Sequence, residues 1–174
     1  RNCMMHKDLL LGIDVGTTGT KCSVYDFNGK RVASAYREYP MLHPRPGWTE
    51  QDPSRWWDAV CCNLQTIFQS QDIDKNRIAA VGTSSTNAVF LADRQGQPLC
   101  NAISLHDQRS GPQVEWLKEN IGEERIRDLA ANRIANGSFS LPALRWLVEN
   151  RPDLIKRAHK LMVPCGYVIQ KLTG

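Results

Sequence analysis

The chain has 174 residues, which is enough for one domain with its own hydrophobic core. Hydrophobic residues make up 41% and charged residues 23%, as in an ordinary globular protein. The net charge is only +4, no run of Lys and Arg occurs, and no apolar run approaches the roughly 18 residues that cross a membrane. We therefore expect neither nucleic acid nor membrane among its partners.

The cysteine pattern indicates reduced thiols. There are six cysteines, without a Cys-x-x-Cys pair and without a His spacing that would complete a zinc site. This usage is typical of a cytoplasmic protein, which is the localisation we expect.

The first predicted element is a strand interrupted by an acid. Residues 9–15 form an apolar run, which predicts a strand buried on both faces. Asp14 falls within this run. A buried carboxylate is costly unless it is paired or holds a metal, so Asp14 is a candidate functional residue.

Gly16-Thr17-Thr18-Gly19 predicts a tight turn between this strand and a second one over 20–27. Glycines permit positive φ and close approach of the backbone, and successive N–H groups with two hydroxyls can form an anion-binding nest. Asp14 can hold Mg²⁺, and Lys21 adds a positive charge for a phosphate. The spacing is neither a Walker A loop nor Gly-x-Gly-x-x-Gly. An ordinary hairpin with a capped turn is the alternative.

The following segments predict an α/β domain. Asn28-Gly29 predicts a two-residue hairpin turn into a third strand, 30–38. Residues 39–51 hold three prolines and predict a long loop. Asp52-Pro53 then predicts the start of a helix that ends near Gln69, with Trp56 in the core. Residues 78–84 predict a buried, central parallel strand, reached by a right-handed crossover.

Shorter elements fill the rest of the chain. We expect strands at 88–91, 99–104 and 160–163, helices at 110–120, 123–131 and 140–149, a short helix from Pro152, and a helical turn at 166–172.

Two motifs carry a resemblance to a known family. Gly12–Lys21 resembles the first phosphate motif of the actin, Hsp70 and sugar-kinase superfamily. The segment 46–53, Pro-Gly-Trp-Thr-Glu-Gln-Asp-Pro, followed by Trp56-Trp57, is similar to the Pro-Gly-Trp-x-Glu-x-Asp-Pro segment of the FGGY carbohydrate kinases. The second motif is the more specific. Together the pieces cover nearly the whole chain.

The resemblance implies an RNase H-like, actin-like ATPase fold: a mixed sheet with three antiparallel opening strands and flanking helices. Residues 1–174 would be an incomplete N-terminal FGGY domain, with the C-terminal nucleotide-binding half absent. The implied activity is ATP-dependent phosphorylation of a sugar, polyol or sugar-acid hydroxyl, with ATP and Mg²⁺. The catalytic base is expected in the absent half, so we assign no catalytic residue and expect this chain alone to be inactive.

The resemblance also implies roles for particular residues. Asp14 would hold the metal, and the phosphate would be bound by Gly16, Thr17, Thr18, Gly19 and Lys21. Substrate binding falls to Thr86, Asn87, Asp107 and Arg109.

Three departures from the family pattern bear on the substrate. Thr86-Asn87-Ala88 stands where the family has Arg-Glu in glycerol kinases or Met-His in xylulose kinases. Leu105 replaces the Trp of a Trp-x-Asp-x-Arg pattern that Asp107 and Arg109 match, and Cys165 stands where an Asp is usual. The first departure argues against glycerol and xylulose as substrates, and the loss of the acid at Cys165 argues for an unusual substrate or a diverged family member.

Several alternatives stay open at this stage. Trp48 and Glu50 either line the sugar cleft or only hold their loop, and Asp107 with Arg109 could be a surface pair at a helix start. The rivals to a kinase are an actin-like or chaperone-like ATPase and a non-catalytic sugar-binding relative. The expected partner is a small-molecule carbohydrate, and a homodimer is left open.

Overall fold

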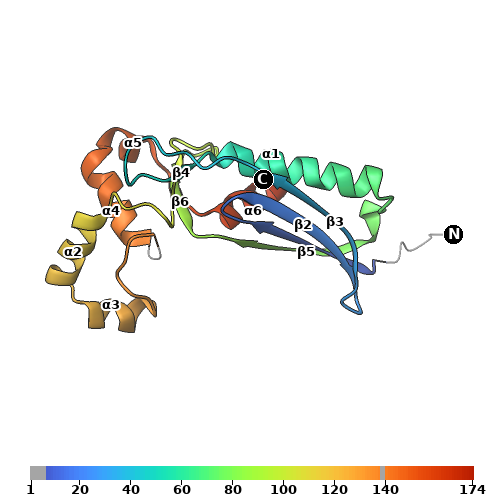
Figure 1. The fold of residues 1–174 in the computed structure, drawn as a ribbon, viewed down its shortest axis with the longest axis horizontal. Coiled ribbons are helices and arrows are strands. Elements are labelled where there is room, and N and C mark those ends of the chain that lie inside the picture. Colours follow the sequence, from blue (N-terminus) through green and yellow to red (C-terminus); the bar gives the residue numbers. More distant parts are fainter. Residues whose placement is uncertain (1–6, 138–139) are drawn as a thin grey trace.

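The computed structural model describes residues 7–137 and 140–174. Its first sheet has the strand order β3-β2-β1-β5, where β1 is Leu9–Val15, β2 Gly19–Asp26, β3 Arg31–Glu38 and β5 Ile78–Ser85. The pairs β1–β2 and β2–β3 are antiparallel, and β5 is parallel to β1 (Figure 1). This confirms the predicted α/β class, the three antiparallel opening strands and the parallel crossover.

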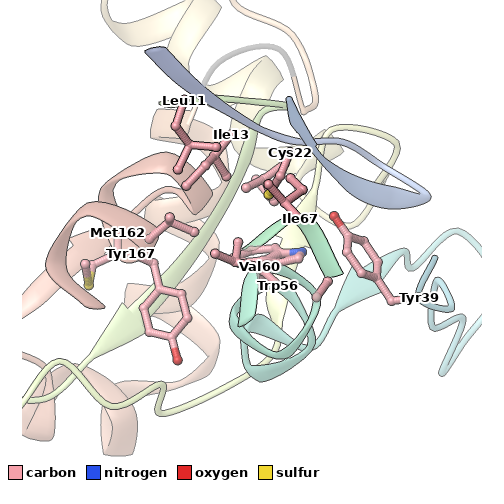
Figure 2. Close-up of a cluster of buried hydrophobic side chains, with 14 of the residues drawn as sticks. Leu11, Ile13, Cys22, Tyr39, Trp56, Val60, Ile67, Met162 and Tyr167 are labelled. Atoms are coloured by element: carbon pink, nitrogen blue, oxygen red, sulfur yellow. The ribbon is translucent and has the colours of Figure 1, made fainter. Parts of the chain in front are cut away.

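Helices α1 (Pro53–Gln65) and α6 (Pro164–Thr173) cover one face of this sheet (Figure 1). Asp52 caps α1 by accepting from the Ser54 amide, and Pro53 is its first residue, as predicted. A π-helical turn, Thr66–Ser70, continues α1, and a 3₁₀ turn, Lys75–Arg77, precedes β5. The main core lies between the sheet and these helices, where Trp56 is fully buried and packs edge-on against Tyr167 (Figure 2). Trp56 also packs against Phe90.

The opposite face of the first sheet is open in the part of the chain that the structure describes. Burial alternates along β1, so Leu9, Leu11, Ile13 and Val15 are buried whereas Leu10 and Asp14 are exposed. The prediction of a strand buried on both faces, with Asp14 inside, is therefore wrong. β5 is also not a buried central strand but an edge strand, and most of its residues are exposed.

The β2–β3 hairpin has a longer turn than its Asn-Gly pair predicts. The Asp26 amide donates to the Lys30 carbonyl at 2.9 Å, which encloses Phe27 to Gly29. The Asp26 carboxylate accepts from the Asn28 and Lys30 amides, each at 2.9 Å, and Gly29 takes the positive φ of 81° that closes the loop. The aspartate therefore selects a three-residue turn.

The second sheet is smaller and has the order β4-β7-β6-β8, with β4 Glu50–Gln51, β7 Ala102–Ser104, β6 Ala88–Ala92 and β8 Lys160–Met162. All five residues of β6 are buried. The predicted loop 39–51 thus ends in a short strand, and the predicted strand 99–104 is reduced to three residues.

Helices α4 (Ser140–Asn150) and α5 (Pro152–Arg157) share a second buried cluster with β6. Helices α2 (Gly111–Asn120) and α3 (Glu123–Ala130) join α4 at one end of the molecule (Figure 1). Their small core consists of Val114, Leu117, Ile126 and Ile134. No helix in the described ranges is long and apolar enough to cross a membrane.

The described cysteines are free thiols. Burial raises the pKa of the Cys22 thiol, on β2 within the main core, to about 11. At neutral pH this thiol is protonated, and it packs as a small apolar side chain.

Candidate phosphate and carbohydrate site

The turn Gly16–Gly19, here called the phosphate turn, joins β1 to β2 at the end of the sheet. The Gly16 amide donates to the Gly19 carbonyl at 2.9 Å, which leaves Thr17 and Thr18 at the tip. Within the described chain, the amides of these two threonines have no hydrogen-bond partner. Two free N–H groups and two hydroxyls together form a suitable cradle for phosphate oxygens.

The two glycines of the turn serve close approach and not positive φ. Neither glycine has a positive φ, so the expectation that the turn needs glycine for a positive φ is wrong. A Cβ on Gly16 would lie 2.9 Å from the Gly19 carbonyl oxygen, and a Cβ on Gly19 would lie 2.7 Å from the Arg37 carbonyl oxygen. Glycine is required here because the backbones of the turn and of β3 leave no room for a side chain.

Three buried or partly buried side chains donate to carbonyl groups on the inner side of this segment, two in the turn itself and one in β2 directly after it. The Tyr39 hydroxyl donates to the Gly16 carbonyl at 2.7 Å, Gln51 Nε2 to the Thr17 carbonyl at 2.9 Å, and Asn63 Nδ2 to the Thr20 carbonyl at 2.8 Å. Burial raises the pKa of Tyr39 to about 12, so its hydroxyl remains a donor at neutral pH.

Asp14 and Lys21 lie on the open face of the sheet, beside the phosphate turn. They are cross-strand neighbours in the β1–β2 register and therefore share a face. With Ser84 they line a hollow of about 480 Å³. Ser84 Oγ donates to Asp14 Oδ1 at 2.6 Å, and neither Asp14 nor Lys21 joins an ion pair in the described chain.

Asp14 fits a magnesium ion better than a transition metal. Among the described residues no three His, Cys, Asp or Glu side chains gather into a metal cluster. Mg²⁺ is commonly held by one or two carboxylates while its other ligands are water and phosphate oxygens. A single exposed carboxylate beside a turn with two unpartnered amides fits that preference.

Thr86 and Asn87 lie where the chain passes from β5 to β6, between the two sheets. Thr17 Oγ1 donates to Thr86 Oγ1 at 3.3 Å, which joins this corner to the phosphate turn. Asn87 Nδ2 donates to the Gly137 carbonyl, so its amide oxygen is the group left for a ligand. The structure therefore brings Thr86 into contact with the turn and holds Asn87, the next residue, against Gly137.

Asp107 and Arg109 form a buried pair with Glu50, not a surface pair. Arg109 Nη2 bonds Asp107 Oδ2 at 2.8 Å and Glu50 Oε1 at 2.7 Å, and Arg109 Nε bonds Asp107 Oδ1 at 2.9 Å. Asp107 also accepts from the amides of Thr49 at 2.6 Å and of Arg109 at 2.8 Å. These four donors occupy the acceptor positions of one carboxylate. Direct contact of Asp107 with a sugar stays a prediction, and its visible contacts hold the surrounding loops.

Trp48 and Glu50 contact Arg109, which supports the loop-holding alternative for both. The Arg109 Cζ atom lies 3.7 Å from the ring centroid of Trp48, and Trp48 packs edge-on against Trp146 at 5.3 Å. Glu50 Oε2 accepts from Asn101 Nδ2 at 2.9 Å.

Sequence reasoning missed the residues behind the phosphate turn, Tyr39, Gln51 and Asn63. A signal existed for Asn63: it lies three positions after Val60 and seven after Trp56, on the buried face of α1. A polar residue on an apolar helical face predicts a buried hydrogen bond. Gln51 gave no such signal, because only the strand pairing of β4 shows which way its side chain points.

Comparison with known proteins identifies the family to which the chain belongs. The profile of the FGGY family of carbohydrate kinases, N-terminal domain, matches residues 9–174, and the chain belongs to this family. This confirms the resemblance drawn from the two motifs and sets aside membership of the actin and chaperone families.

The relatives include kinases for different carbohydrates. The chain is 33% identical over 166 residues to a xylulose kinase from Staphylococcus xylosus, covering 95% of this chain and 34% of that protein. It is 33% identical over 170 residues to a glycerol kinase from Thermococcus kodakarensis, with the same coverage of 95% and 34%. A ligand-bound xylulose kinase structure from Lactobacillus acidophilus superposes with a TM-score of 0.83 at 29% identity, covering 94% of this chain and 33% of that one. The chain thus spans about a third of the length of the curated relatives it matches.

Proposed function

We propose that this chain supplies the phosphate-turn and carbohydrate-facing part of an ATP-dependent kinase that phosphorylates a hydroxyl of a sugar, polyol or sugar acid. Membership of the FGGY family of carbohydrate kinases supports this class of enzyme. The observation that carries the proposal is the cluster of two unpartnered turn amides, an exposed carboxylate and a lysine on one rim of the sheet.

Phosphoryl transfer depends mainly on positioning and on stabilising charge, and this rim can do both. The unpartnered amides of Thr17 and Thr18, together with the hydroxyl groups of these two residues, would bind phosphate oxygens as negative charge develops on them. Lys21 would contribute a positive charge from the open face. When Mg²⁺ is bound at Asp14, it would neutralise part of the phosphate charge.

The carbohydrate would lie on the side of Thr86 and Asn87. The hydroxyl of Thr86 and the free amide oxygen of Asn87 suit the hydroxyl groups of a polyol or sugar. Asp107 and Arg109 would act through the loops that they hold. The proposal gives this chain binding and positioning roles, and it assigns no residue here to the removal of the hydroxyl proton.

The test is a coupled ADP-release assay on the full-length protein that carries this sequence, with Mg-ATP and a panel of polyols, pentuloses, hexuloses and sugar acids. We expect one compound to raise turnover well above the background ATPase. Asp14→Asn should lower kcat about 100-fold or more, whereas Asp26→Asn, at the opposite end of the β1–β2 ladder, should leave it unchanged. Binding of a carbohydrate without any transfer would instead favour the non-catalytic relative.

A further inference from the structure

Gln51 connects the two sheets through a side chain that is completely buried. Its backbone pairs with Ala102 of β7 in the second sheet, while its Nε2 donates to the Thr17 carbonyl in the phosphate turn of the first sheet. The preceding residue, Glu50, turns the other way and bonds Arg109, because adjacent residues of a strand face opposite sides. The two-residue strand β4 thus contacts both parts of the proposed site.

Peptide planarity gives the Gln51 hydrogen bond a directional consequence. In a trans peptide the C=O and N–H groups point in opposite directions. Gln51 holds the Thr17 carbonyl inward, so the Thr18 amide points outward. Tyr39 holds the Gly16 carbonyl in the same way, which turns the Thr17 amide outward. These are the two amides that lack partners in the described chain.

The Gln51 amide acts through its nitrogen alone. Gln51 Oε1 is buried and has no hydrogen-bond partner among the described atoms. Burial of an unmatched acceptor is unfavourable, so an apolar side chain of similar length would suit the packing at least as well. What an apolar residue could not supply is the donor to Thr17.

We propose that Gln51, assisted by Tyr39, is a positioning residue that aims the Thr17 and Thr18 amides at the transferred phosphate and sets the turn relative to the carbohydrate side. This inference rests on the proposed function. Removing the donor should leave substrate binding nearly intact but misplace the groups that stabilise developing charge.

The decisive variant is Gln51→Met, compared in the full-length protein with Gln113→Met. Gln113 is a matched control because it is also buried, donates through Nε2 to Glu149 at 2.6 Å and has an unpartnered Oε1, but lies on α2. We expect Gln51→Met to lower kcat about 10- to 100-fold with the carbohydrate KM changed less than twofold. Tyr39→Phe should act in the same direction.

Hydrogen exchange of the Gly16 amide gives a readout that does not depend on activity. This amide closes the turn, so its exchange should speed up at least tenfold in Gln51→Met and not in Gln113→Met. Unchanged exchange, unchanged kcat, or an equal loss in the control would each overturn the inference. If the unmodified protein showed no carbohydrate-stimulated turnover, the proposed function would fail, while the exchange comparison would still decide whether Gln51 orders the turn.

Discussion

The guanidinium of Arg109 stacks on Trp48, with Cζ 3.7 Å from the ring centroid, while its Nε and Nη2 atoms donate hydrogen bonds to the buried carboxylate of Asp107. The Arg109 side chain is only 4% exposed and that of Asp107 only 1%. Burial of two charges is tolerated because each is paired and hydrogen-bonded. This contact ties the Pro-Gly-Trp segment to the corner before α2.

Arg109→Lys should therefore be destabilising although it keeps the charge. A lysine can neither bond Asp107 through two nitrogens nor stack on Trp48 in the same way. We expect a loss of about 2–3 kcal/mol in the free energy of unfolding, measured by urea denaturation. Arg151→Lys, in an exposed pair with Asp153, should change it by less than about 0.5 kcal/mol. Equal effects of the two substitutions would contradict the buried role of Arg109.

Gly19→Ala should disturb the phosphate turn. Its Cβ would lie 2.7 Å from the Arg37 carbonyl oxygen, which is backbone and cannot move aside cheaply. We expect a loss of about 1–3 kcal/mol in stability and a lower kcat in the assay above. Gly111→Ala at the start of α2 is the control, since a Cβ there meets only Asn136 Nδ2, at 3.9 Å. A Gly19→Ala protein with normal stability and turnover would show that the turn has room to shift.

Asn87→Asp should weaken carbohydrate binding selectively. The substitution replaces the donor to the Gly137 carbonyl with a negative oxygen, which would move the side chain away from its present position. We expect the carbohydrate KM to rise about tenfold or more and the KM for Mg-ATP to stay within twofold. Asn120→Asp is the control, because Asn120 also donates to a backbone carbonyl, that of Trp116, but on α2. A larger change in the KM for Mg-ATP would place Asn87 in the nucleotide site instead.

The buried Cys22 thiol should make stability fall in alkaline solution. Its pKa rises from 9.0 to about 11 on folding, so between these values the unfolded state loses the proton and the folded state keeps it. The unfolded state is therefore favoured as pH rises, by about 1.4 kcal/mol at pH 10. Cys22→Ala should show a loss between pH 7 and pH 10 that is smaller by that amount, in urea denaturation under reducing conditions. Parallel pH profiles for the two proteins would mean that Cys22 titrates normally in the fold.

Most elements were predictable because their signals are local. Asp52-Pro53 marks the start of α1, and the pairing of strands around Gly16–Gly19 follows from two β-rich runs joined by a short turn. Burial was harder to predict. An apolar run such as residues 9–15 looks the same whether one or both faces of the strand are covered, and the exposed side of Asp14 depends on which helices pack where.

The sequence by itself determined the family, the phosphate turn and the candidate residues, because these depend on residue types at short, fixed spacings. Only the tertiary structure decided what those residues do to one another. In the folded chain the Asp107 carboxylate accepts hydrogen bonds from Thr49 and Arg109. The Gln51 side chain bonds the carbonyl of Thr17, 34 residues away in the chain. Such contacts arise from the packing of two sheets, and no local pattern in the sequence encodes which carbonyl a buried amide will reach.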